Sequence, residues 1–96
     1  MTQVGLMEIE IHIPAAQSLK QKRTVIKSLR DRTTQKFNIS MAEVAFHDKW
    51  QRAMLAIAIV SADRNHIENQ FAQVLNFIEA EIVGSAIIIG SELTFL

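Results

Sequence analysis

MEIEIHI, residues 7–13, alternates apolar side chains with glutamate and histidine. Successive side chains of a β-strand point to opposite faces of the sheet, so this stretch predicts a strand with one buried and one polar face. Pro14 ends the strand, because proline has no amide hydrogen to donate to a neighbouring strand. The rest of the chain must supply a layer that covers the apolar face.

A helix is predicted after this strand. Ser18 and Gln21 have the spacing of a capping box at a helix N-terminus. The apolar residues that share one helical face are Leu19, Val25, Ile26, Leu29 and Phe37. Lys22 falls within this apolar face, so we expect its side chain either to extend outward to solvent or to serve a ligand.

Two strands are predicted next. The first covers Ile39–Phe46, and a turn or bulged hairpin follows at His47–Trp50. The second covers Ala53–Val60 and is apolar on both faces, which is typical of a central strand.

A second helix and a last strand complete the chain. Ser61 or Asp63 caps the helix at its start, and Gly84 ends it. Gly90 indicates a bulge or bend in the last strand. The apolar residues of that strand are Ile87, Ile89, Leu93 and Phe95.

The order strand, helix, strand, strand, helix, strand predicts an α+β fold, a ferredoxin-like βαββαβ sandwich that forms one domain over residues 1–96. Right-handed crossovers place both helices on one face of a four-stranded antiparallel sheet with the strand order 4-1-3-2. This architecture hosts many unrelated activities, so the fold alone indicates no function.

Composition narrows the class of protein. Hydrophobic residues make up 49% and charged residues 21% of the chain, a balance typical of a compact domain. The absence of cysteine excludes disulfides and thiolate metal sites and fits a reducing compartment. Residues 1–7 lack the features of a signal peptide, and no apolar run reaches the roughly 18–20 residues that cross a bilayer. We therefore expect a cytoplasmic protein that does not contact membranes.

A net charge of zero conceals a strong asymmetry. Residues 18–36 contain seven basic residues and one acidic residue, a net charge of +6, which leaves −6 for the rest of the chain. Four of these cations, Lys20, Arg23, Lys27 and Arg30, recur at helical spacing and form a cationic stripe on one helix face. Such a stripe either binds the phosphates of a nucleic acid or is a solvated helix surface.

The polar face of the first strand carries Glu8, Glu10 and His12, which are side chains able to bind a metal or to transfer protons. Neighbouring side chains on one strand face lie roughly 6.5–7 Å apart, too far for one ion without further ligands. Only Glu43 and Glu92 are candidates to supply them. An ordinary polar outer face is the simpler interpretation.

Residues 47–52 form the densest cluster of functional groups. His47 beside Asp48 resembles an acid–base pair, but no serine, cysteine or metal-ligating partner is near in sequence. We therefore expect no catalytic residues, no metal and no cofactor. Trp50, the sole tryptophan, either binds a base or protein partner or caps the hydrophobic core.

The predicted open face of the sheet argues against one mode of RNA binding. RNA-recognition domains of this topology stack bases on aromatic residues of the first and third strands, whereas this chain has acids on the first and no aromatic residue on the third. The apolar residues Met54, Ala56 and Ala58 instead suit pairing with another sheet, which predicts a homo-oligomer, most simply a dimer.

The chain contains four short motifs: SLKQKR at 18–23, FNIS at 37–40, AE at 42–43 and DKWQR at 48–52. With them the chain resembles, over essentially its full length, the YlxP-like family of bacterial conserved hypothetical proteins, a domain of unknown function. Gln21 stands where glutamate is frequent, and Lys49 where an apolar residue is usual. The resemblance implies a ferredoxin-like sandwich and, in many bacteria, a gene beside those for translation initiation and ribosome maturation. The matched positions to test are Lys20, Lys22, Arg23, Trp50, Gln51 and Arg52.

We expect a non-enzymatic binding module that contacts RNA or a ribonucleoprotein through its basic first helix. The candidate nucleic-acid-binding residues are Lys20, Lys22, Arg23, Lys27, Arg30, Trp50 and Arg52. The alternative is a dimer or larger oligomer that forms through the open sheet face and binds a small ligand or a protein partner. An enzyme would depend only on Glu8, Glu10, His12, His47 and Asp48.

Overall fold

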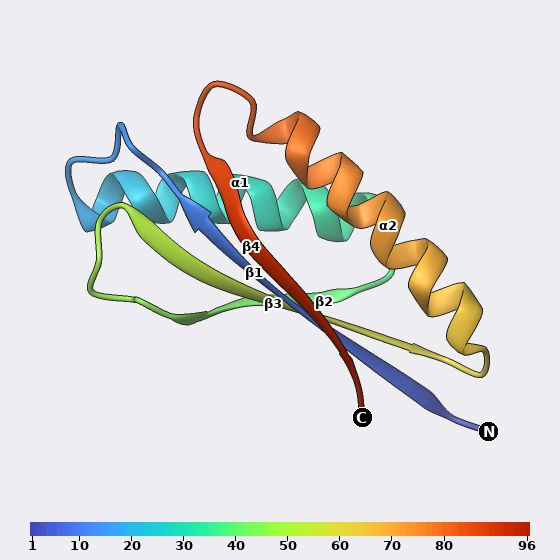
Figure 1. Cartoon of the computed structure of the whole chain (residues 1–96). Helices are drawn as coiled ribbons and strands as arrows, with labels where there is room; N and C mark the ends of the chain where they lie inside the picture. The colour runs from blue at the N-terminus through green and yellow to red at the C-terminus, as the bar shows by residue number, and fades with distance from the viewer.

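The computed structural model describes all 96 residues. The elements are β1 (Gln3–His12), α1 (Leu19–Lys36), β2 (Ser40–Ala45), β3 (Arg52–Ser61), α2 (Arg64–Glu81) and β4 (Ile87–Phe95), drawn in Figure 1. The four strands form one antiparallel sheet in the order β2-β3-β1-β4, which confirms the predicted order. This is the ferredoxin-like βαββαβ arrangement.

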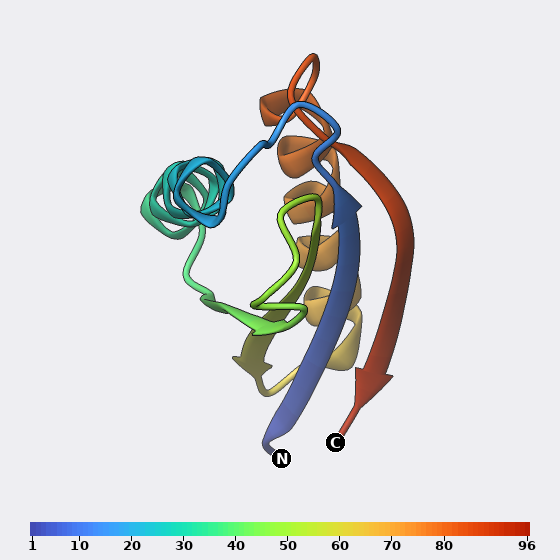
Figure 2. The same cartoon turned by 90° about the vertical axis from the view of Figure 1, so that its left-hand side faces the viewer.

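Both helices lie on the same side of the curved sheet, as Figure 2 shows with α1 viewed nearly end-on. The strict alternation of β1 places every second side chain toward the helices, and the apolar run of β3 does the same from the neighbouring strand. The buried residues of these two strands include Met7, Ile9, Ile11, Leu55, Ile57 and Ile59. α2 covers them with Ile67, Phe71, Val74 and Ile78. Neither helix has the length and apolar composition needed to cross a membrane.

The helix starts follow the predicted capping chemistry. Ser18 Oγ accepts a hydrogen bond from the Gln21 amide at 3.1 Å, and Gln21 Oε1 accepts one from the Gln17 amide at 2.7 Å. Of the two candidates for the second cap, Asp63 is the N-cap, and its Oδ1 accepts from the Asn65 amide at 2.9 Å.

The packing of β4 differs from the predicted pattern. The bulge or bend that Gly90 indicates is confirmed by a register shift beside it, but two of the apolar residues named for this strand, Ile87 and Ile89, are more than half exposed, at 57% and 56%. Gly90 pairs with Glu10 and Ile88 pairs with Ile11, so Ile89 is an extra residue in the ladder. This bulge shifts the alternation by one residue and turns Ile88 toward the core instead.

Candidate nucleic-acid interface

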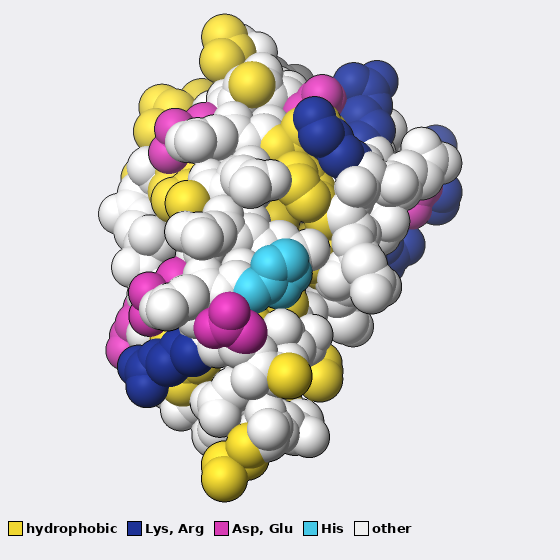
Figure 3. Space-filling view, turned by 90° about the vertical axis from the view of Figure 1, so that its right-hand side faces the viewer, with side chains coloured by type: hydrophobic (Ala, Val, Ile, Leu, Met, Phe, Trp, Pro, Cys, Tyr) yellow, Lys and Arg dark blue, Asp and Glu magenta, His cyan; other side chains and the backbone are white.

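All four side chains of the cationic stripe are exposed on α1. Three of them, Arg23, Lys27 and Arg30, line a shallow groove of about 240 Å³ together with Ile26 and with Glu43 of β2. The stripe therefore faces the β2 side of α1 and not the side that packs on α2. In Figure 3, Lys and Arg side chains gather mainly along the right-hand edge of the molecule, and Asp and Glu side chains mainly toward the left.

Asp31 is the acidic residue that partly neutralises the stripe. Lys27 Nζ forms an ion pair with Asp31 Oδ2 at 2.9 Å, and Arg30 Nε lies 3.9 Å from Asp31 Oδ1. The hydrogen bond from Lys27, helped by the charges of both cations, lowers the pKa of the Asp31 carboxyl below its ordinary value. Lys20 and Arg23 form no ion pair within the chain, so they remain available to an external anion.

The structure corrects the expectation for Lys22, whose side chain is 0% exposed. Its ammonium points inward, where it lies 2.8 Å from Glu43 Oε2 and donates to the backbone carbonyl oxygens of Phe46 at 2.8 Å and Arg52 at 3.2 Å. A third, longer contact of 3.5 Å reaches the carbonyl of His47. A ligand or an RNA cannot reach Lys22, because the chain itself supplies all its partners.

The loop between β2 and β3, residues 46–51, is shaped to receive this ammonium. Phe46 has a φ of +63°, the left-handed region that non-glycine residues seldom adopt, and this turns its carbonyl toward Lys22. A register shift between Glu43 and Ala45 bends the end of β2 just before the loop. The buried lysine and the unusual backbone therefore form one structural unit.

Gln51 ties the other end of the loop to the connection between β1 and α1. Its side-chain amide donates to the carbonyl oxygens of Pro14 at 3.1 Å and Ala16 at 3.2 Å. Its backbone carbonyl accepts from the Ile13 amide at 2.9 Å. We name this set, formed by Lys22, Glu43 and Gln51 with their backbone partners, the loop anchor. Sequence reasoning missed it, although a lysine inside an apolar helix face was its visible signal.

Trp50 projects from the anchored loop and is 54% exposed. The interpretation that it caps the core is therefore wrong, because a core-capping indole would be mostly buried. Lys49 and Asp48 beside it are exposed as well. The loop thus presents an aromatic ring to the surroundings at the end of α1 where the cationic stripe begins.

Arg52 does not join the stripe. Its guanidinium lies on the open face of the sheet, where Nε and one terminal nitrogen donate to Glu10 Oε2 at 3.0 and 2.8 Å. It also stacks over the Phe46 ring, with its central carbon 4.0 Å from the ring centroid. Arg52 is therefore not part of the cationic stripe, because two of its three guanidinium nitrogens are engaged by Glu10, although it also lines the hollow around Trp50.

The open sheet face brings Glu8, Glu10 and Glu92 to the walls of a shallow hollow of about 310 Å³. Glu43, expected to assist them, lies opposite Leu55 on the helix side of the sheet and pairs with Lys22, so that expectation is wrong. No group of three or more His, Cys, Asp or Glu side chains is placed to hold a metal ion.

The possible acid–base pair in the loop is not formed. The ring of His47 contacts the Glu43 carbonyl oxygen at 3.1 Å, and no hydrogen bond joins it to Asp48. The imidazole therefore helps to hold the loop in place instead of acting on a neighbouring carboxylate.

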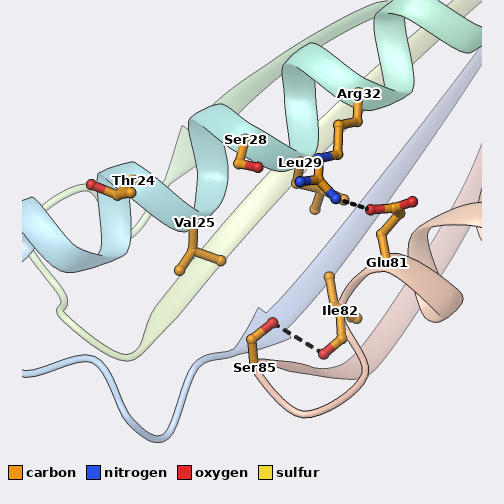
Figure 4. Close-up of a pocket in the computed structure, with 8 residues that line it drawn as sticks. All are labelled: Thr24, Val25, Ser28, Leu29, Arg32, Glu81, Ile82 and Ser85. Atoms are coloured by element: carbon orange, nitrogen blue, oxygen red, sulfur yellow. Dashed lines mark hydrogen bonds and ion pairs between the residues drawn. The ribbon is translucent and has the colours of Figure 1, made fainter.

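A further hollow of about 240 Å³ lies between α1 and the end of α2 (Figure 4). Its two charged residues neutralise each other, since Arg32 and Glu81 form an ion pair at 2.8 Å across the hollow. Ser85 Oγ donates to the Ile82 carbonyl at 3.1 Å. The hollow offers no unpaired charge to a ligand, and its ion pair holds the two helices together.

Comparison with known proteins agrees with this fold. The chain is 42% identical over 77 residues to the uncharacterized protein YlxP of Bacillus subtilis (strain 168), a match that covers 80% of this chain and 84% of that protein. Among solved structures it is similar to the de novo designed protein Foldit4, with a TM-score of 0.58 and 14% identity over 100% of this chain and 97% of that one. The de novo designed protein LFR1 1 with ferredoxin fold matches with a TM-score of 0.50 and 17% identity, over 100% and 84% of the two chains.

At these identities the likeness to the designed proteins concerns the fold alone. The family described as "Protein of unknown function (DUF503)" matches residues 4–89, which include both helices, the loop anchor and most of the sheet. With this match and the similarity to YlxP, the chain belongs to the DUF503 family.

Proposed function

We propose that this protein is a non-enzymatic binding module that contacts RNA or a ribonucleoprotein through the cationic stripe of α1. The observation that carries the proposal is the exposure of Lys20, Arg23, Lys27 and Arg30 on one helix face of a chain whose other parts are net acidic. The ten residue steps from the first to the last cation span about 15 Å of helix. This is a continuous track for a phosphate backbone.

The physical basis is counterion release. Each Lys or Arg that neutralises a phosphate frees a condensed cation into solution, so binding is favourable and depends on salt but carries little sequence preference. The acidic remainder of the surface repels RNA and orients the stripe toward it. Phosphate contacts alone fix the position of the RNA, so a role in recognising one sequence would need further residues.

A salt series tests the proposal. With four phosphate contacts on single-stranded RNA, the logarithm of the affinity falls with the logarithm of the salt concentration with a slope of about −3. This corresponds to a loss of about 50-fold between about 50 and 200 mM salt. Fluorescence anisotropy of a labelled RNA provides the affinities, and a complete absence of binding at low salt would refute the proposal.

Charge variants locate the binding surface. The double variant Arg23→Gln/Lys27→Gln removes two cations from the stripe and reduces the slope by about half. Asn69→Asp/Gln73→Glu is the matched control, because it changes the net charge equally at exposed positions of α2, away from the stripe. Asp31→Asn releases Lys27 from its ion pair and strengthens binding. Equal losses in both double variants would show that only the overall charge matters.

A second candidate function is self-association through the open sheet face, as the basis for binding a small ligand or a protein. Small apolar residues from two adjacent strands, Ala42, Ala56 and Ala58, occupy neighbouring positions there, and Val60 is 68% exposed. Small side chains allow a second sheet to approach closely, and a stable pair needs about 800 Å² of buried surface from each partner. A second copy of the chain would bury this apolar zone symmetrically.

Sedimentation at micromolar concentration tests this candidate. We expect a dimer whose dissociation constant rises strongly in Ala56→Glu, because the variant buries an unpaired carboxylate at the centre of the interface. The control is Ser28→Glu, on the helical side of the molecule. A wild-type protein that sediments as a monomer would remove this candidate and leave the RNA proposal intact.

A further inference from the structure

We propose that the RNA bound by the stripe is single-stranded and that one of its unpaired bases stacks on Trp50. This inference rests on the function proposed above and adds the class of RNA and the residue that recognises it. The groove beside α1, the exposed indole and the loop anchor carry it together.

The groove and the loop lie at the same end of the molecule. α1 and β2 are consecutive in the chain, and the contacts from Lys22 to Glu43 and Phe46 place the first turns of α1 beside the end of β2. The groove lined by Arg23, Lys27 and Arg30 also contains Glu43, which Lys22 neutralises, and its Arg23 end is the one nearer to the loop that follows β2. Figures 1 and 2 both place this loop near the N-terminal end of α1.

Trp50 has no partner of its own in the chain. Its side chain is 54% exposed, and no aromatic pair or cation–ring contact involves it, in contrast to Phe37, Phe46, Phe77 and Phe95. The loop around it forms an open hollow of about 450 Å³ lined by residues 48–52. A large exposed ring beside a basic groove is the combination found in proteins that bind single strands, in which bases stack on aromatic side chains and the backbone follows the cations.

The loop anchor makes this ring a preformed contact. Lys22 binds carbonyl oxygens at both ends of the loop, and Gln51 binds the segment before α1, so residues 46–52 are held to the domain at several points. A loop that is already ordered loses little conformational entropy on binding. Lys22 thus serves as a positioning residue for Trp50 without touching the RNA.

A duplex does not fit the same surface. Its bases are stacked on one another, and proteins that recognise double-stranded RNA contact two successive minor grooves over about 16 base pairs. The stripe is a single track of about 15 Å, and the loop near its N-terminal end carries one exposed aromatic ring. A short single strand can contact both the cations of the stripe and the Trp50 ring, whereas a duplex can contact only the cations.

The sole tryptophan makes the test direct. Intrinsic fluorescence is titrated with a single-stranded oligouridylate of about ten nucleotides and with a duplex of similar length. We expect the single strand to quench Trp50 and the duplex to leave it nearly unchanged. In parallel, anisotropy of labelled oligouridylate measures binding to Trp50→Ala, Trp50→Phe and, as a control at an exposed apolar residue outside the site, Val83→Ala.

Trp50→Ala is expected to weaken binding of the single strand about 5- to 150-fold, the range measured for loss of one base–aromatic stack. Trp50→Phe keeps a ring and retains most of the affinity, and Val83→Ala binds like the wild type.

Salt-dependent binding without quenching, and with Trp50→Ala unchanged, would overturn the inference and leave the proposed function standing. Equal affinity for the duplex would overturn it as well. Failure of both the single strand and the duplex to bind, even at low salt, would refute the proposed function itself. Circular dichroism confirms that the exposed-site variants are folded.

Discussion

Lys22 is the residue with the largest structural consequence in this chain. Its ammonium is removed from water, and the ion pair with Glu43 and the loop carbonyls together replace its hydration. A buried ion pair contributes little net stability compared with a well-packed apolar pair, but removing one partner leaves the other charge buried and unpaired. Glu43 Oε2 is buried and has no hydrogen bond besides this ion pair, so it depends on Lys22 alone.

Lys22→Met is expected to lower the free energy of unfolding by about 3–5 kcal/mol, because it leaves Glu43 uncompensated and the loop carbonyls without a donor. The double variant Lys22→Met/Glu43→Leu recovers part of this loss, since no charge is then buried. Lys20→Met, an exposed neighbour in the stripe, changes stability by less than about 0.5 kcal/mol. Urea denaturation measures all three, and equal effects for the two single lysine variants would contradict the role of Lys22.

At the scale of the elements, α2 packs closely on β1 at Gly5. A Cβ atom at Gly5 would lie 2.5 Å from Ile67 Cγ2 and 2.8 Å from Phe71 Cε2. Both of these side chains are buried in the core, so neither can move aside easily. Gly5 therefore allows α2 to pack closely against the start of β1. A Cβ atom at Gly90, in the edge strand β4, would have no neighbour within 4 Å.

Gly5→Ala is expected to destabilise the protein by about 1–3 kcal/mol, the range found when a methyl group is forced into a packed core. Gly90→Ala is the matched control, because it adds the same group to a strand in open space, and it stays within about 0.5 kcal/mol of the wild type. Thermal or urea unfolding distinguishes the two. Similar values for both variants would mean that α2 shifts freely on the sheet.

At the scale of the whole molecule, 18 buried residues form one hydrophobic core. They come from both helices, from β1, β2 and β3 and from the connecting segments, and none comes from β4. The loop anchor connects the exposed loop to this core, so the loop has no independent stability of its own. The net charge is also divided unevenly over the molecule, with +6 on residues 18–36 and −6 on the remainder. The molecule is therefore one folding unit with one basic side.

A single cooperative unfolding transition is expected, because small domains with one core unfold without populated intermediates. Far-UV circular dichroism reports the helices, and the fluorescence of Trp50 reports the loop. The two signals should give the same urea midpoint in the wild-type protein. A loop transition at lower urea than the helix transition would show that Lys22 does not couple the loop to the core.

Most of the fold follows from local patterns in the sequence. The alternation at 7–13 and the apolar run at 53–60 reflect the two-residue repeat of a strand, and they predict the strands and their buried faces. The cap at Ser18 is a contact between residues close in sequence, and it predicts the start of a helix. None of these predictions requires knowledge of distant residues. The cationic stripe follows in the same way from helical spacing. These predictions are confirmed by the strand order and by the exposure of the stripe.

The contacts between distant segments were decided only by the tertiary structure. Lys22 finds its carbonyl partners 24 and 30 residues away, at the two ends of a loop that begins with Phe46 in a left-handed backbone conformation. Gly90 indicated a bulge in β4, but the extra residue is fixed at Ile89 only by the pairing with β1, and this decides which isoleucines of β4 face the core. Periodicity is a property of each segment alone, whereas partner choice and register depend on where the segments meet in space. The sequence therefore determined which surfaces exist, and the tertiary structure determined which charged side chains remain on them.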